Sequence, residues 1–283
     1  MAVVGATLAF AVPASAVTIQ VHPGPQALRD AIHRAHAGDT LRVHSGRYRE
    51  HVTVAKRLTI QGAAGERPPV IDGRCRANDT ILVTKSGVTL RRLKVVGADE
   101  GHGSFPSEVF FTGVERGHAQ ALTVRDTCDA EYGINLFGTG PVRVLDSTAT
   151  GFGDSGVYVG GIMDTGGGRL LVKGNDLFGN SRGAIVEDTA FAADVRLADN
   201  LVHVNTIAGS EGPSDGVFLH NADGVWLRHN DASDNGAYGY HADPNSDGNV
   251  FLDNTASGNA SGPFLDEGAG NCGAGNSFAI APC

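Results

Sequence analysis

The feature that most constrains this chain is a block that recurs from residue 133 onward. Each block opens with Gly and an alternating apolar strand, as in Gly133-Ile-Asn-Leu-Phe and Gly216-Val-Phe-Leu-His. A second short apolar strand follows, and then a pair of Asn residues in N-x4-N spacing, at 175/180, 200/205, 230/235 and 254/259. Recurrence in register predicts a repeat protein in which each block is one coil of a stack.

The physics of parallel strands explains this pattern. Strands of neighbouring coils lie about 4.8 Å apart, so equivalent positions form ladders along the axis. Inward positions carry Val, Ile and Leu, whereas Asn at a sharp turn tolerates left-handed backbone and can bond to the Asn of the next coil. The 40 glycines and few aromatic residues suit many short strands and tight turns. We therefore expect an all-β chain folded as a parallel β-helix.

The N-terminal part predicts the one helix. Pro25 to Ala35 places Pro in the first turn and gathers Leu28, Ala31 and Ile32 on one apolar face. Because the end of a β-helix exposes strand edges and apolar interior, we expect residues of about 17–36 to form an N-terminal cap. The whole of 17–283 is then a single domain.

Residues 1–16 resemble a signal peptide. Val3 to Val12 is small and apolar, and Ala14-Ser15-Ala16 is an A-x-A cleavage site, so we expect a secreted, extracellular protein. No Lys or Arg follows Met1, and we therefore expect the true start to lie upstream.

Four cysteines suit an oxidising compartment and allow three pairings. Cys75–Cys128 would join early coils and Cys272–Cys283 would clip the C-terminus, and we expect this pairing. No C-x-x-C spacing supports a thiolate metal site.

Two sequence signals carry a family resemblance. The run Ala37-Gly-Asp-Thr-Leu-Arg-Val with Gly46-Arg-Tyr, and the Gly-apolar blocks with N-x4-N, resemble the pectin-lyase-like superfamily with its NosD-like and polysaccharide-lyase-like repeats. The resemblance covers about residues 17–280 and implies a right-handed parallel β-helix. It leaves the activity open, because that scaffold hosts lyases, hydrolases, epimerases and inert shafts.

Alignment of the coils on their opening Gly places Glu187, His220 and Asp243 one above another on successive coils. His241 is expected beside Asp243. A His flanked by carboxylates is an arrangement used for acid/base catalysis, so we predict Glu187, His220, His241 and Asp243 as catalytic residues. The alternative is a solvent-facing polar column without chemistry, since outward β-helix positions are mostly polar.

Aromatic and polar residues around this column predict substrate contacts. Tyr158 and Phe218 lie on the adjacent ladder and would form apolar platforms for sugar rings. The predicted substrate-binding residues are Tyr158, Phe218, Asn221, Asp188 and Asp215. The segment Tyr238-Gly-Tyr-His-Ala-Asp243-Pro resembles the Tyr-Gly-aromatic-Asp-Pro-His segment of β-helix alginate epimerases. Here His241 precedes the Asp and Asn245 follows the Pro, so the likeness supports only Asp243 and His241.

A cation site is weakly indicated in the same region. Asp243, Asn245 and Asp247 have the D-x-N-x-D spacing of Ca²⁺ loops, but Asn254 stands where an EF-hand needs Glu. An ordinary Asx turn accounts for the same spacing. The sequence requires no cofactor.

The charge pattern limits the partners. With 22 basic and 31 acidic residues the chain carries −9 and has no Lys/Arg cluster, which argues against nucleic acid. No apolar run is long enough for a membrane span. Arg91, Arg125, Lys173 and Arg228 are expected at equivalent outward positions, where acidic polysaccharide would fit, but Leu145 and Ala198 interrupt the row and favour a solvated face.

We therefore expect a secreted monomer acting on a polysaccharide or oligosaccharide, as a lyase, epimerase or glycoside hydrolase. The first alternative is a non-catalytic glycan-binding surface module that uses the same groove. The second is an isomerase or cyclase of a small molecule, which a pocket closed by residues 206–215 would favour.

Overall fold

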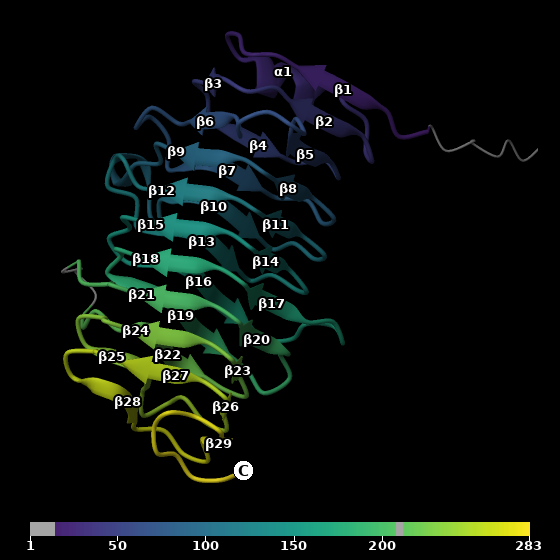
Figure 1. Cartoon of the computed structure of the whole chain (residues 1–283). Coiled ribbons are helices and arrows are strands. Elements are labelled where there is room, and N and C mark those ends of the chain that lie inside the picture. The colour runs from purple at the N-terminus through teal and green to yellow at the C-terminus, as the bar shows by residue number, and fades with distance from the viewer. Residues whose placement is uncertain (1–14, 208–211) are drawn as a thin grey trace, which may run out of the picture.

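The computed structural model describes residues 15–207 and 212–283. One 11-stranded and two 9-stranded sheets, all with parallel pairing, wind around a common core into an elongated solenoid (Figure 1). The predicted all-β, right-handed parallel β-helix is confirmed.

We call the sheets A, B and C. Sheet A consists of β1 (Thr18–Val21), β2 (Thr40–Val43), β5 (Thr59–Gly62), β8 (Thr89–Arg91), β11 (His118–Gln120), β14 (Arg143–Leu145), β17 (Leu170–Lys173), β20 (Val195–Ala198), β23 (Trp226–Arg228), β26 (Val250–Leu252) and β29 (Cys272–Ala274). Sheet B consists of β3 (Arg47–Tyr48), β6 (Val70–Asp72), β9 (Lys94–Val96), β12 (Thr123–Arg125), β15 (Thr148–Thr150), β18 (Asp176–Phe178), β21 (Leu201–His203), β24 (Asp231–Ser233) and β27 (Thr255–Ser257). Sheet C consists of β4 (Val52–Val54), β7 (Asp79–Val83), β10 (Ser107–Thr112), β13 (Tyr132–Phe137), β16 (Ser155–Ile162), β19 (Arg182–Thr189), β22 (Val217–Ala222), β25 (Tyr238–Ala242) and β28 (Gly262–Asp266). The helices are α1 (Ala27–Arg34) and the short 3₁₀ helix η1 (Glu100–His102).

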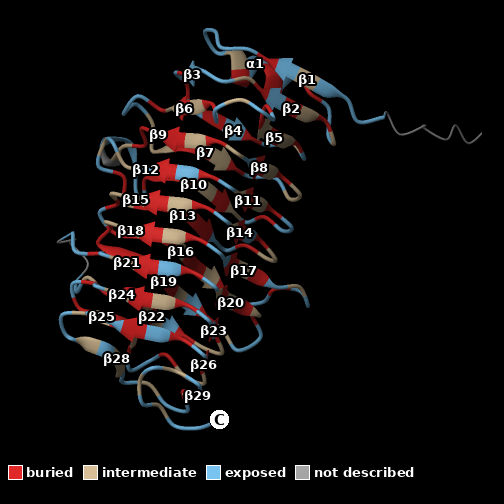
Figure 2. Cartoon of the chain, in the orientation of Figure 1, coloured by how far each residue is buried: buried red, intermediate tan, exposed pale blue. Residues whose placement is uncertain are grey.

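The core is a continuous column of apolar side chains enclosed by the three sheets. Along sheet A, for example, Leu41, Ile60 and Leu90 are paired one above another and are buried. Figure 2 shows buried residues along the strands, interrupted in many strands by intermediate or exposed ones. Each coil therefore buries its inward face only by stacking on its neighbours, as a repeat protein requires.

The predicted alignment of the coils matches the strand register of sheet C. Tyr158, Ile185, Phe218 and His241 are paired in successive strands, and Glu187 is paired with His220. The outward columns read from the sequence are therefore real columns.

The sequence pattern missed one strand per coil. The two Asn of each N-x4-N pair do not mark a single turn, because they flank a three-residue strand of sheet B, such as β18 between Asn175 and Asn180. Such a strand has only one inward residue, Leu177 in this coil, and so it is too short to show alternation.

Two Asn ladders connect the coils. In the first, the side-chain amides of Asn175, Asn200, Asn230 and Asn254 each donate to the side-chain oxygen of the next Asn, at 2.8–3.1 Å. The second ladder runs from Asn180 through Asn205 and Asn235 to Asn259, at 2.9–3.0 Å. The predicted coil-to-coil role of these residues is thus present in the structure.

Helix α1 lies at the N-terminal end of the stack and buries Leu28, Ala31 and Ile32 (Figure 1). It begins later than predicted because Gln26 has left-handed backbone with φ of 54°. Residues 18–21 of the expected cap form β1, which pairs with β2. The capping role of the helix stays a prediction.

Both expected disulfides, Cys75–Cys128 and Cys272–Cys283, are present. The predicted signal peptide, residues 1–16, lies outside the described residues except for its last two.

Arg125 does not share a column with Arg91, Lys173 and Arg228, because it belongs to sheet B and they belong to sheet A. The sequence pattern wrongly placed Arg125 in the second strand of its block, because β12 of sheet B lies very close in sequence to β11, the sheet A strand of that block.

Candidate functional site

A hollow of about 530 Å³ lies on the outer side of sheet C. Its lining residues come mainly from four successive strands, β13, β16, β19 and β22. Of the predicted site residues, the hollow contains Tyr158, Glu187, Asp188, Phe218 and His220.

Glu187, His220 and Asp243 form the column that the sequence predicts. The Nδ1 atom of His220 lies 2.6 Å from Oδ2 of Asp243, and its Nε2 atom lies 3.8 Å from Oε1 of Glu187. The His220 side chain is 45% exposed, whereas that of Asp243 is only 10% exposed. His220 thus presents one ring edge to solvent while a buried carboxylate holds the other.

Asp243 is fixed by more than the imidazole. It follows β25 directly, and its Oδ1 accepts hydrogen bonds from the Ser246 hydroxyl and from the backbone N–H groups of Asn221 and Asn245. Burial by itself would raise the pKa of Asp243, but these hydrogen bonds outweigh it and hold the pKa below the ordinary value. Asp243 is therefore an ionised acceptor, which favours the proton of neutral His220 on Nδ1 and leaves Nε2 as the basic atom.

Tyr158 and Glu187 form a second pair beside the imidazole. The Tyr158 hydroxyl donates to Oε2 of Glu187 at 2.6 Å. Burial, and then the carboxylate of Glu187, raises the pKa of Tyr158 well above its ordinary value, so the hydroxyl keeps its proton. Gly160 makes this contact sterically feasible, since a methyl group at Gly160 would overlap the Tyr158 ring.

His241 belongs to a different cluster. Its Nδ1 lies 2.9 Å from Oδ2 of Asp215 and its Nε2 lies 3.2 Å from Oε2 of Glu267. Burial lowers the pKa of His241, but the two carboxylates outweigh it and the net pKa is raised. The Phe218 ring lies between the two histidines, 5.6 Å from His220 and 4.9 Å from His241 between ring centroids. His241, which was expected beside Asp243, has Asp215 and Glu267 as its carboxylate partners.

The predicted substrate-binding residues occupy three kinds of position. Tyr158 and Phe218 are half-buried in the hollow. Asp188 is exposed and lines it, and Asp188 Oδ1 accepts a 2.6 Å hydrogen bond from the side chain of Asn221, which is also exposed. Asp215 is completely buried and bonds to His241 and to the backbone N–H of Tyr238. Asp215 therefore contacts His241, and burial keeps it from the substrate contact expected of it.

The sequence reading missed a buried ion pair in the floor of the hollow. Arg182 and Asp154 lie 3.1 Å apart and are 3% and 7% exposed, and the Arg182 guanidinium lies 5.0 Å above the Phe218 ring. Tyr132 and Glu131 line the same side. The signal was available, because Tyr132 and Arg182 directly precede the opening Gly of their blocks and so share a column.

The D-x-N-x-D segment has the hydrogen bonds of a turn. Asp243 Oδ1 accepts the N–H of Asn245, as in an Asx turn, and Asp247 Oδ1 accepts the N–H of Ala269. A Ca²⁺ site here stays a prediction.

Among the residues that the structure describes, no helix is long and apolar enough to cross a membrane.

Solved structures share this fold at low sequence identity. The pectate lyase Pel9A matches with a TM-score of 0.72 and 13% identity, over 95% of this chain and 82% of that one. A rhamnogalacturonan lyase matches with a TM-score of 0.64 and 14% identity, over 84% and 74% of the two chains. An alginate lyase from Paenibacillus sp. str. FPU-7 matches with 0.57 and 17%, over 89% and 99%. The search of curated proteins returned no match.

A family model described as "Periplasmic copper-binding protein (NosD)" matches residues 105–280. Copper favours imidazole, thiolate and thioether donors. Within 15–207 and 212–283, no three His, Cys, Asp or Glu side chains are arranged to hold a metal ion, and all four cysteines are in disulfides. The described residues therefore do not fit a copper site.

The family match covers the repeats. It spans every N-x4-N pair and the segments that contain Glu187, His220 and Asp243, and it covers more than half of the chain. The protein belongs to the NosD family of right-handed β-helix proteins.

Proposed function

We propose that the protein is a carbohydrate-active enzyme that removes a proton from a sugar carbon, as a polysaccharide lyase does. The observation that carries the proposal is the 2.6 Å contact between the ionised Asp243 and Nδ1 of His220, a residue that lines the hollow together with Tyr158. The lyase structures of similar fold support carbohydrate as the substrate class.

Each residue has a distinct role in this reaction. His220 Nε2 takes the proton from the carbon, and the C–O bond to the leaving sugar breaks as a C=C bond forms. Tyr158, whose raised pKa keeps it protonated, turns its O–H from Glu187 to the departing oxygen and gives that oxygen the proton. Asp243 is a positioning residue that fixes the His220 tautomer, and Glu187 orients the Tyr158 hydroxyl.

The geometry supports glycoside hydrolysis less well. A hydrolase needs one protonated carboxyl group and one free carboxylate across the scissile bond. Asp243 has a lowered pKa and is held by its hydrogen bonds, and Glu187 accepts the Tyr158 proton at Oε2. An epimerase would use the same base but return a proton to the same carbon, so product analysis separates it from a lyase.

The test is turnover of polygalacturonate, alginate and rhamnogalacturonan, followed by ultraviolet absorbance of the unsaturated product. His220→Ala should lower kcat about 10²- to 10⁴-fold, the usual contribution of a general base. Asp243→Asn should lower kcat with little change in KM. His229→Ala is the matched control, because His229 also lies between two carboxylates and is 47% exposed, against 45% for His220.

Equal turnover by the His220→Ala and wild-type proteins would refute the site. Binding of a glycan without turnover would favour the non-catalytic module. The small-molecule alternative stays a prediction, because residues 208–211 of the segment that would close the pocket lie outside the described part.

We further propose that the protein is exported and monomeric, without nucleic acid or membrane partners. The periplasmic description of the family and the two disulfides support a location outside the cytoplasm.

A further inference from the structure

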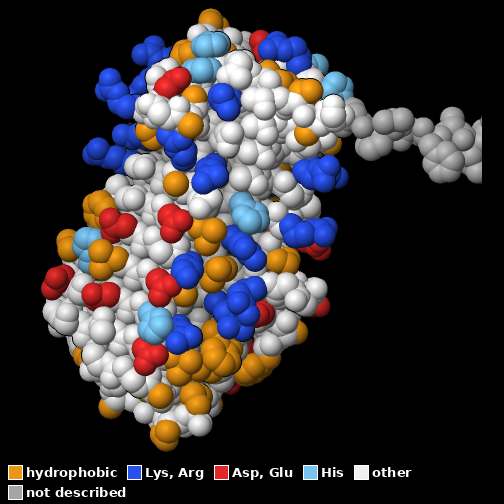
Figure 3. All heavy atoms as spheres, turned by 45° about the vertical axis from the view of Figure 1, so that its right-hand side comes forward, with side chains coloured by type: hydrophobic (Ala, Val, Ile, Leu, Met, Phe, Trp, Pro, Cys, Tyr) orange, Lys and Arg blue, Asp and Glu red, His pale blue; other side chains and the backbone are white. Residues whose placement is uncertain are grey.

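The outer face of sheet A, away from the hollow on sheet C, carries a regular series of basic residues. Six successive strands, β8 to β23, each present one basic side chain outward. They are Arg91, His118, Arg143, Lys173, Arg196 and Arg228, which with Trp226 we call the basic face. Figure 3 shows Lys and Arg side chains over much of this side of the molecule, with some Asp and Glu side chains among them.

No acidic residue occupies an outward position on these six strands. The other outward residues are Thr89, Gln120, Leu145, Leu171 and Ala198, together with Trp226. This is notable in a chain of net charge −9. The acidic residues near the face lie at its turns, where Asp194 pairs with Arg196 and Asp199 pairs with Lys173.

Three of the basic side chains keep their charge uncompensated. Arg91, Arg143 and Arg228 form no ion pair with any residue in the described part of the chain. All three are exposed. Burial, and then the positive charge of Arg143, lowers the pKa of His118. Both effects favour the neutral form of its imidazole.

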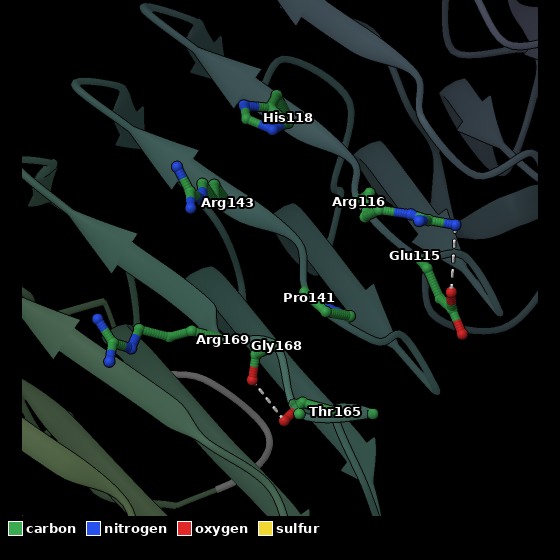
Figure 4. A pocket seen from close by; sticks show the side chains of 10 residues that line it. Glu115, Arg116, His118, Pro141, Arg143, Thr165, Gly168 and Arg169 are labelled. Carbon is green, nitrogen blue, oxygen red and sulfur yellow. Dashed lines mark hydrogen bonds and ion pairs between the residues drawn. The ribbon is translucent and has the colours of Figure 1, made fainter.

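The surface also has shape. A hollow of about 470 Å³ lies beside Arg143 and is bordered by Arg116, His118, Arg169 and the glycine turn at 166–168 (Figure 4). Figure 4 shows His118, Arg143 and Arg169 at successive levels of the stack. Farther along, the Trp226 ring is 40% exposed and lies 5.2 Å from the Arg196 guanidinium.

We propose that the basic face is a second binding surface, and that its ligand is an acidic polysaccharide lying parallel to the solenoid axis. Basic groups recur once per coil, about every 4.8 Å, which is close to the length of one sugar ring along a chain. A carboxylate on successive sugars would thus meet an Arg or Lys charge at each of these coils except that of His118, whose lowered pKa favours the neutral imidazole. The Trp226 ring provides an apolar platform for a sugar face.

The same observations disfavour nucleic acid as the ligand. Single-stranded nucleic acid is usually held by several aromatic rings on which successive bases stack. The outward positions of the six sheet A strands include one large aromatic residue, Trp226, and it lies at the end of the row. The inference does not rest on the proposed catalysis, since the basic face and His220 lie on different sheets.

The experiment measures binding by calorimetry at low salt with the whole chain. The probe is an oligogalacturonate long enough to span the six strands. Arg143→Gln/Arg228→Gln is the test variant, and Arg125→Gln is the matched control because it removes an exposed outward Arg from sheet B. Circular dichroism checks that each variant is folded.

The double variant should raise Kd about 2- to 30-fold, as expected for the loss of two exposed ion pairs, and should weaken the salt dependence. Arg125→Gln should bind like the wild type, and both Arg variants should keep the turnover that His220→Ala loses if the proposed function is correct. Equal Kd values for the double variant and Arg125→Gln would overturn the inference. Equal or tighter binding of neutral maltooligosaccharide, or of single-stranded DNA with the same number of charges, would also overturn it.

Discussion

The Asn ladders predict a large stability loss from one substitution, Asn200→Ala. Asn200 is buried in the middle of the first ladder and its side chain makes four hydrogen bonds. It donates to the Val172 carbonyl and to Asn230 Oδ1 at 3.0 and 2.8 Å. It accepts from the backbone and side-chain amides of Asn175 at 3.0 and 2.9 Å.

The magnitude follows from these contacts. A net contribution of about 0.5–1.5 kcal/mol per hydrogen bond gives a loss of roughly 2–6 kcal/mol in the free energy of unfolding. The upper part of that range is expected, because the Asn175 N–H would be left buried without its partner. Asn245→Ala is the control, since Asn245 is exposed and no described residue bonds to its side chain.

Urea unfolding followed by circular dichroism measures both variants. Asn245→Ala should change the free energy of unfolding by no more than about 0.5 kcal/mol. A loss below about 1 kcal/mol for Asn200→Ala would refute the view that the ladder holds adjacent coils together. A second, earlier transition in Asn200→Ala alone would show that the coils separate at the altered position.

Four further predictions concern other parts of the molecule. Burial raises the pKa of Glu108 to about 8 from 4.5, so wild-type stability should fall as pH rises from about 4.5 to 8, and Glu108→Gln should remove that fall in urea unfolding at several pH values. The pKa of His241 is raised from 6.5, so its stabilisation is complete below pH 6.5 and is lost as pH rises through the folded value; His241→Gln should flatten this dependence in the same assay. Loop entropy predicts that Cys75→Ser, which opens a 53-residue separation, costs about 4 kcal/mol and Cys272→Ser, with 11, about 3, and thermal unfolding with and without reductant tests that order. Gly160→Ala should displace Tyr158 and lower kcat at least about 10-fold with unchanged Tm, and an unchanged kcat would contradict the role of Tyr158.

The sequence by itself determined the coil and its register. In a parallel stack each position repeats once per coil, so the spacing of Gly and Asn places Glu187 beside His220 without any coordinates. The disulfide pairing was also accessible, because an even number of cysteines left few choices. The third strand of each coil was not, since a strand with one inward residue, such as Leu177, has no readable alternation.

The tertiary structure decided how the side chains on those columns pair. Register fixes which backbones are neighbours, and His220 contacts Asp243 within its own column. The side chain of His241 instead contacts Asp215 and Glu267, which belong to adjacent columns. The burial of Asp215 is likewise decided by the tertiary structure, because no sequence pattern in its loop indicates it. The basic face likewise needed the structure, because its charges alternate between two outward columns of sheet A and their uncompensated state depends on where the neighbouring carboxylates lie.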